Sequence, residues 1–156
     1  EKLRRPVEEV KAIRDAQNKA LPGLPELERE IKDMARAGQP VLTWGGRVYH
    51  CEPPQYVEKF HKTMTFEYKL LNYIIQGSAA DATKEAIIRY QNHPKRRGRL
   101  LVTVYDEINV SVPKKYAKEE YTILRKCMEG LEFDVPLLTD GKIGDNWGDL
   151  KKYVDA

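Results

Sequence analysis

The sequence predicts an α+β protein in which antiparallel β-hairpins pack against helices. Three observations favour this class. Apolar residues recur every three to four positions through long segments, which is the period of a helix face, and short β-rich runs are bounded by tight-turn signals. Helices and hairpins also lack the regular alternation of a parallel α/β sheet. The 156 residues are 41% hydrophobic and 33% charged, as in soluble globular proteins.

Helical periodicity appears twice near the N-terminus. Apolar and small residues repeat at helical spacing over Val7–Ala20, and Pro22-Gly23 ends this pattern. A second helix is expected over Pro25–Ala37, because proline suits a first helical turn and Gly38 suits the end of a helix.

A hairpin and a long helix are expected next. The β-rich runs Val41–Trp44 and Arg47–Cys51 flank Gly45-Gly46, a two-residue hairpin signal. A short helical stretch is expected after Pro54, followed by one long helix over Thr65–Tyr90.

The C-terminal half predicts a second hairpin, a third amphipathic helix and a final strand. The runs Leu100–Val104 and Ile108–Val112 enclose a tight turn. The helix is expected over Lys114–Gly130 and the strand over Val135–Ile143. The helix residues expected to face inward are Tyr121, Leu124 and Met128.

Charge and apolar content narrow the function classes. No apolar run approaches the roughly 20 residues of a membrane span, and Glu1–Pro6 does not begin a signal peptide. We therefore expect no membrane partner and a cytoplasmic location, the host cytoplasm if the protein is viral. The net charge of +3 suits an anionic partner. The basic loop Asn92–Arg99 is interpreted as a solvated turn, with phosphate contact as the alternative.

Two adjacent carboxylates, Asp106 and Glu107, lie at the tight end of the second predicted hairpin. Carboxylate oxygens on a rigid support are ligands that Mg²⁺ prefers, with substrate phosphates completing the octahedral shell. The alternative is that both are ordinary solvated turn residues.

Two segments carry motifs in a fixed order. Asn72–Asp81 has Asn, three residues and then Gln-Gly-Ser-Ala-Ala-Asp, and Val104–Ile108 has Val-Tyr-Asp-Glu-Ile. These motifs resemble those of family A DNA polymerases, the bacterial polymerase I class and its phage relatives, in which a helix with Asn, three residues and Gln-Gly-Thr/Ser-Ala-Ala-Asp precedes a hairpin with Val-His-Asp-Glu. Thr43–Tyr49 and Gly141–Trp147 resemble the flanking family segments, so the resemblance covers nearly the whole chain.

The resemblance implies that residues 1–156 form, as a single unit, part of the fingers and palm in a fragment of the polymerase right-hand fold, with a palm-type antiparallel sheet. It implies Mg²⁺-dependent nucleotidyl transfer from a dNTP to a primer 3′-hydroxyl. Asp106 and Glu107 are then the catalytic and metal-binding residues, and the primer–template DNA contacts are Asn72, Gln76, Tyr105 and Arg47.

Helix geometry explains why the two amides of Asn72 and Gln76 could act together. Asn72 and Gln76 are four residues apart on the predicted helix, so both project from one face. Amides of this kind in the family reach minor-groove base edges, where every base pair offers a similarly placed acceptor. For Arg47, a surface hairpin charge is the open alternative.

The chain departs from the family pattern in several places. Tyr105 replaces the usual histidine, and Tyr68 replaces an arginine that contacts DNA in bacterial members, so that contact is not carried over. The family's Asp-Tyr-Ser-Gln-Ile-Glu motif and its triphosphate-binding fingers helix do not occur here. We therefore expect the rest of the polymerase, from the same precursor or a second chain, as a partner, and no activity from this chain alone.

Two alternatives to this interpretation stay open. One is a non-catalytic DNA-binding subunit, or a fragment of a split polymerase. The other is a single-subunit RNA polymerase, whose hairpin usually has His-Asp-Ser, whereas Asp106-Glu107 favours DNA synthesis.

Overall fold

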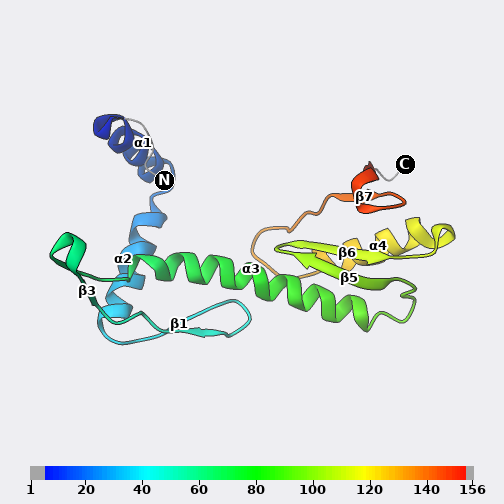
Figure 1. The fold of residues 1–156 in the computed structure, drawn as a ribbon, viewed down its shortest axis with the longest axis horizontal. Helices are drawn as coiled ribbons and strands as arrows, with labels where there is room; N and C mark the ends of the chain where they lie inside the picture. The colour runs from blue at the N-terminus through cyan, green and yellow to red at the C-terminus, as the bar shows by residue number, and fades with distance from the viewer. Residues whose placement is uncertain (1–5, 154–156) are drawn as a thin grey trace. The chain divides into compact units, whose positions relative to one another are not determined.

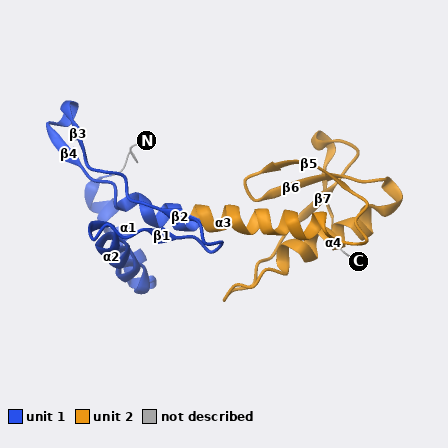
Figure 2. Cartoon of the chain, turned by 90° about the horizontal axis from the view of Figure 1, so that it is seen from below, with its two compact units in different colours: residues 1–75 blue, residues 76–156 orange. Residues whose placement is uncertain are grey.

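The computed structural model describes residues 6–153, so the first five residues considered for a signal peptide lie outside it. The chain divides into two compact units, residues 1–75 and 76–156 (Figure 2). The predicted α+β class is confirmed, since the chain combines helices with antiparallel hairpins (Figure 1). In the described part the strands form separate two-stranded ladders. That residues 1–156 act as one polymerase segment stays a prediction.

Unit 1 begins with α1 (Val7–Ala20) and α2 (Gly23–Arg36), close to the predicted bounds. Acidic residues in the first turn of each helix complement the positive end of the helix dipole. α1 buries no residue, whereas α2 buries Ile31. The core of unit 1 consists of Ile31, Val41 and Leu70, and partly buried apolar residues pack around them.

The predicted first hairpin is present but short, with β1 (Val41–Leu42) paired to β2 (Val48–Tyr49). The short helical stretch expected after Pro54 is reduced to the 3₁₀ helix η1 (Glu58–Phe60). The prediction missed the hairpin around it, in which β3 (Gln55–Val57) pairs with β4 (Lys62–Met64). His61 ends η1 in the left-handed region at φ 47°, which returns the chain after too few residues for an α-helix.

The predicted long helix is confirmed as α3 (Tyr68–Gln91). Its residues up to Ile75 belong to unit 1 and those from Gln76 onward belong to unit 2. Leu70 is therefore part of the unit 1 core, and Tyr90 is part of the unit 2 core.

In unit 2, β5 (Arg99–Val104) pairs antiparallel with β6 (Glu107–Ser111), as predicted. A 3₁₀ turn, η2 (Lys114–Tyr116), leads into α4 (Ala117–Glu129). A core cluster of unit 2 consists of the buried residues Tyr90, Ile123 and Cys127.

The predicted inward face of α4 is wrong by one position. Tyr121, Leu124 and Met128 are half-buried, and the buried residues are Glu120, Ile123 and Cys127. The reason is that the Glu120 carboxylate accepts hydrogen bonds inside unit 2, which turns a charged position of the helix inward.

The predicted final strand is confined to β7 (Gly141–Ile143), which pairs with β8 (Lys151–Tyr153). Pro136 falls inside the expected strand and has no amide hydrogen for a ladder. Between β7 and β8 lies η3 (Trp147–Asp149), capped by the Asn146 side chain. Across residues 6–153, no helix combines the length and apolar character that crossing a membrane requires.

Candidate active site

The β5–β6 hairpin closes with a two-residue turn. Val104 pairs with Glu107, which leaves Tyr105 and Asp106 as the loop. The backbone of Tyr105 is left-handed, at φ 54°, and its side chain is 92% exposed. A left-handed conformation costs a residue with a side chain roughly 1–2 kcal/mol, and no burial of the ring offsets this cost. Strain of this kind, seen in the backbone, is a reason to look for a function in the turn.

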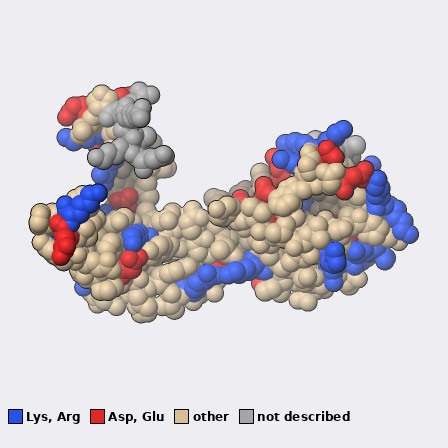
Figure 3. Space-filling view, viewed as in Figure 1, with Lys and Arg blue, Asp and Glu red and all other residues tan. Residues whose placement is uncertain are grey.

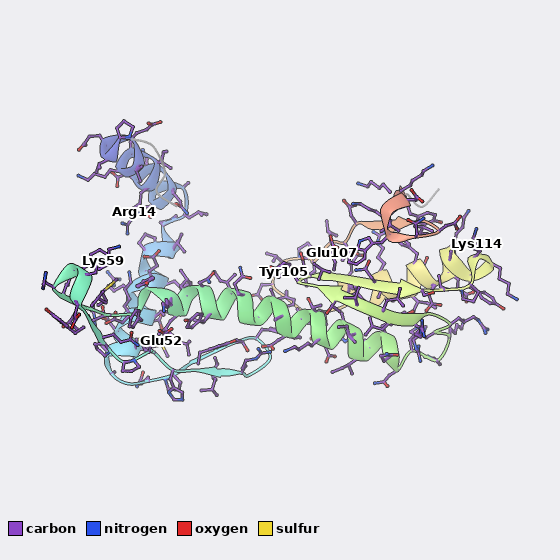
Figure 4. All side chains as sticks on the ribbon, viewed as in Figure 1. Arg14, Glu52, Lys59, Tyr105, Glu107 and Lys114 are labelled. Atoms are coloured by element: carbon purple, nitrogen blue, oxygen red, sulfur yellow. The ribbon has the colours of Figure 1, made fainter. Side chains whose placement is uncertain are left out.

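The carboxylates of this turn face solvent. Asp106 and Glu107 are both exposed, and within residues 6–153 neither makes an ion pair or a side-chain hydrogen bond. Figure 4 shows Tyr105 and Glu107 at the same end of the β5–β6 hairpin. Two neighbouring negative charges without a cationic partner repel each other, and a bound cation would relieve that repulsion.

The oxygen donors of the turn suit a hard cation such as Mg²⁺, but they form only part of a coordination shell. In the described part of the chain, no three His, Cys, Asp or Glu side chains gather closely enough to hold a metal ion. A metal at this turn would need further ligands from phosphates, water or other protein segments.

The two predicted amides are exposed on α3. Asn72 and Gln76 are one helical turn apart, so their Cβ atoms are about 5–6 Å from each other. Gly77, next to Gln76, is buried. The helix spacing therefore projects both side chains from one face of α3.

Arg47 lies in a different setting. It is half-buried in the connection between β1 and β2, where its backbone N–H donates to the Thr43 hydroxyl and its carbonyl accepts from the Thr43 N–H. Arg47 belongs to unit 1, whereas Tyr105, Asp106 and Glu107 belong to unit 2. Arg47 and the carboxylate turn are therefore not brought together within one compact unit.

A buried carboxylate that the sequence analysis missed organises unit 2. Glu120 is 1% exposed, and it accepts hydrogen bonds from the Tyr90 hydroxyl and from the backbone N–H groups of Arg97 and Gly98. Burial opposes ionisation, but these hydrogen bonds outweigh it, so the pKa of Glu120 lies below its ordinary value. The sequence could have indicated its burial, because Glu120 lies at helical spacing from the buried residues Ile123 and Cys127.

The fold resembles a polymerase domain. The chain superposes on the POL domain of Pol1 from M. smegmatis, solved in complex with DNA primer-template and dNTP, with a TM-score of 0.71 and 29% identity. The superposition covers 83% of this chain and 24% of that one. A fragment of the right-hand polymerase fold, as predicted, agrees with this match.

The sequence comparisons define the family. The model of DNA polymerase family A matches residues 1–149. The chain therefore belongs to the family A DNA polymerases.

Similar curated proteins include DNA polymerase theta of Drosophila melanogaster, 28% identical over 93% of this chain, and the thermostable DNA polymerase I of Thermus aquaticus, 27% identical over 81%. DNA polymerase I of Bacillus subtilis is 39% identical over 54% of the chain. The chain spans 8% of the length of the Drosophila relative, 15% of the Thermus relative and 10% of the Bacillus relative.

Proposed function

We propose that this chain is part of a template-directed DNA polymerase that transfers nucleotides from dNTPs to a primer 3′-hydroxyl. The observation that carries the proposal is the β5–β6 turn, where Asp106 and Glu107 are exposed and unpaired within residues 6–153. Membership of the family A polymerases supports the reaction class. The M. smegmatis structure, solved with primer-template and dNTP, supports DNA and dNTP as partners.

In this proposal Asp106 and Glu107 hold Mg²⁺, as expected for a family whose members are generally metal-dependent. Two such ions would stabilise the attacking and leaving oxygens, and these carboxylates would supply part of their ligands. The two-residue turn fixes Asp106 against the β5–β6 ladder, so its short side chain has little freedom to lose on binding.

In this proposal, exposed residues outside the carboxylate pair position the primer terminus. Asn72 and Gln76 offer two amide groups from one face of α3 for hydrogen bonds to base edges in the minor groove. Tyr105 presents a solvent-exposed ring and hydroxyl at the turn, where the family usually has histidine. For Arg47 we propose a phosphate contact from unit 1.

The other parts of the site must come from the remainder of a polymerase, either the same precursor or a second chain. The chain contains neither the family's Asp-Tyr-Ser-Gln-Ile-Glu motif nor its triphosphate-binding helix. The cytoplasm, or the host cytoplasm for a phage-like protein, stays the proposed location. A non-catalytic DNA-binding subunit is the second candidate, and the replacement of histidine by Tyr105 is the observation that favours it.

The test is primer extension with Mg²⁺, using the purified 156-residue chain alone and the chain reconstituted with the rest of its polymerase. We expect no incorporation by the chain alone, and incorporation that requires Mg²⁺ in the reconstituted enzyme. Incorporation by the chain alone would contradict the proposed division of the site. A reconstituted enzyme that binds primer–template but does not extend it would support the non-catalytic alternative.

A further inference from the structure

A group of exposed cations in unit 2 takes no part in the site proposed above. They come from the connection between α3 and β5, from the first residue of β5, and from η2 with the start of α4. Lys and Arg side chains gather over this part of unit 2 in the space-filling view (Figure 3). We call this group the basic surface; it consists of Lys95, Arg97, Arg99, Lys115 and Lys118.

Direct contacts join the two segments of the basic surface. The Arg97 guanidinium lies 4.6 Å from the centre of the Tyr116 ring, and the Lys115 ammonium lies 4.8 Å from the same centre. Arg99 pairs with Ser111 across the β5–β6 ladder, which brings the start of β5 next to the chain entering η2. The cations are therefore neighbours in space although the sequence separates them.

The basic surface has no internal counter-charge. Among residues 6–153, none of its five side chains forms an ion pair. The adjacent Lys114 does, with Asp145 at 2.7 Å, as do cations of the unit 1 helices such as Arg36 with Asp33 at 3.1 Å. The nearby Glu120 carboxylate is bonded to backbone N–H groups, and clustered cations that no carboxylate pairs with directly create a positive potential that attracts anions.

Hydrogen bonds to its backbone hold the loop that carries Lys95 and Arg97 in place. Glu120 accepts the backbone N–H groups of Arg97 and Gly98, and the Arg96 guanidinium donates to the Gly98 carbonyl at 2.6 Å. A Cβ atom at Gly98 would collide with the Tyr90 hydroxyl, so the loop packs directly against the core. A preformed loop loses little conformational entropy when a ligand binds.

We propose that the basic surface binds the phosphate backbone of duplex DNA at a position separate from the carboxylate turn. Arg99 is the first residue of β5, and Tyr105 directly follows its last residue. Six residues at about 3.3 Å each place the basic surface about 17–20 Å along the strand from the turn. The inference rests on the proposed function only for the choice of DNA as the anionic polymer.

The chemistry favours phosphate over single carboxylates. Arginine side chains match two phosphate oxygens at once, and lysines add point charges along a backbone. The proposed contacts are to phosphates, which are the same for every base pair, so the interaction is expected to be independent of base sequence. Binding of this kind releases counterions and weakens steeply as salt rises.

The experiment measures binding of a short fluorescein-labelled duplex by the 156-residue chain from about 50 to 200 mM salt, by fluorescence anisotropy. The variant Lys95→Gln/Arg97→Gln/Lys115→Gln removes charge from the basic surface. The control Lys11→Gln/Arg14→Gln/Lys19→Gln makes the same charge change on α1, where all three side chains are exposed. Arg14 is labelled on α1 in Figure 4.

We expect the basic-surface variant to bind duplex at least about tenfold more weakly at 100 mM salt, with a log–log salt slope smaller by about 0.9 for each phosphate that the variant no longer neutralises. The α1 control should keep most of the affinity and slope of the parent. The charge-retaining variant Lys95→Arg/Arg97→Lys/Lys115→Arg should bind like the parent, which separates the effect of charge from an effect on folding.

Equal weakening by the basic-surface variant and the α1 control would overturn the proposal, because net charge alone would then explain binding. Competition by poly-L-glutamate as strong as that by unlabelled duplex of equal charge would also overturn it, in favour of an acidic polypeptide. Asp106→Asn should leave duplex affinity unchanged. Its effect on nucleotide transfer therefore tests the proposed function separately.

Discussion

Both units contain a tyrosine of α3 that donates a hydrogen bond to a glutamate, but the two pairs differ in their surroundings. In unit 1, the Tyr73 hydroxyl lies 2.7 Å from a Glu52 carboxylate oxygen, and the Glu52 side chain is 37% exposed. Lys69 also forms an ion pair with Glu52, with its Nζ 2.9 Å from the Glu52 Oε2. In unit 2, Tyr90 is fully buried and Glu120 is 1% exposed.

The difference shows how burial changes what one pair of residues does. Water can replace Tyr73 as a partner of Glu52, and Lys69 already balances its charge. Glu120 is buried, so water cannot reach it to replace a missing donor, and its carboxylate also accepts the backbone N–H groups of Arg97 and Gly98. The pair in unit 1 is a surface contact, whereas the pair in unit 2 orders the loop that carries part of the basic surface.

The largest expected change in stability distinguishes the Tyr90–Glu120 pair from the Tyr73–Glu52 pair. Tyr90→Phe should lower the stability of unit 2 by about 1.5–3 kcal/mol, because it removes a hydrogen bond to a buried charged group. Tyr73→Phe should have a much smaller effect on unit 1. Native-state hydrogen exchange of core amides in α4 and α2 measures each unit separately. Equal destabilisation by the two variants would remove the distinction.

The same pair predicts a response to pH. The hydrogen bonds hold the pKa of Glu120 below the ordinary value of 4.5. Its stabilising contribution is therefore present above about pH 4.5 and is lost as pH falls through the lower pKa of the folded state. The protection of α4 amides, corrected for the intrinsic exchange rate at each pH, should fall on acidification. It should fall less in Tyr90→Phe, whose Glu120 pKa returns toward the ordinary value. An identical pH dependence in parent and variant would contradict this account.

The turns of the two units give a second, smaller contrast. The β1–β2 connection places Gly46 at φ 80°, whereas the β5–β6 turn places Tyr105 at φ 54°. Tyr105→Gly should raise stability by about 0.5–1 kcal/mol, since the relief of strain exceeds the extra backbone entropy of glycine. Gly46→Ala should lower stability by about 1 kcal/mol. Denaturant unfolding of both variants measures whether each substitution raises or lowers the stability. Destabilisation by Tyr105→Gly would show that the tyrosine supports the fold.

The smallest effect on stability is expected at the exposed amides. Gln76→Ala should change the free energy of unfolding by no more than about 0.5 kcal/mol, while lowering extension or mismatch discrimination in the reconstituted polymerase. Gln91→Ala, at the exposed end of the same helix, is the matched control. Unchanged kinetics on matched and mismatched primer ends would make Asn72 and Gln76 ordinary surface residues.

Local sequence predicted the elements whose own residues determine them. The period of apolar residues located α1 and α3, and paired β-rich runs located the β5–β6 hairpin with Asp106 in its turn. The prediction failed where distant contacts decide. The inward position of Glu120 depends on Tyr90 and on two loop amides, and none of these is visible in the pattern of α4 itself.

For the candidate site too, the sequence predicted the features that depend on short segments and missed those that depend on the folded structure. The spacing of Asn72 and Gln76 on one helix, and the adjacency of Asp106 and Glu107 in one turn, follow from short segments. The left-handed backbone of Tyr105 does not, because its residue type argues against a positive φ. The basic surface also needed the structure, since contacts at Tyr116 join its separate segments.

The central claim is that the β5–β6 turn belongs to a polymerase active site, and Asp106 tests it most directly. Asp106→Asn keeps the shape of the side chain and removes the negative charge that would bind Mg²⁺. The measurement is single-turnover nucleotide incorporation by the complete polymerase, with Glu107→Gln alongside and the exposed Asp134→Asn as a control in unit 2. We predict a rate at least about a hundredfold lower for Asp106→Asn, a smaller decrease for Glu107→Gln, and parental rates for Asp134→Asn. A near-parental rate for Asp106→Asn would contradict the placement of this turn in the active site.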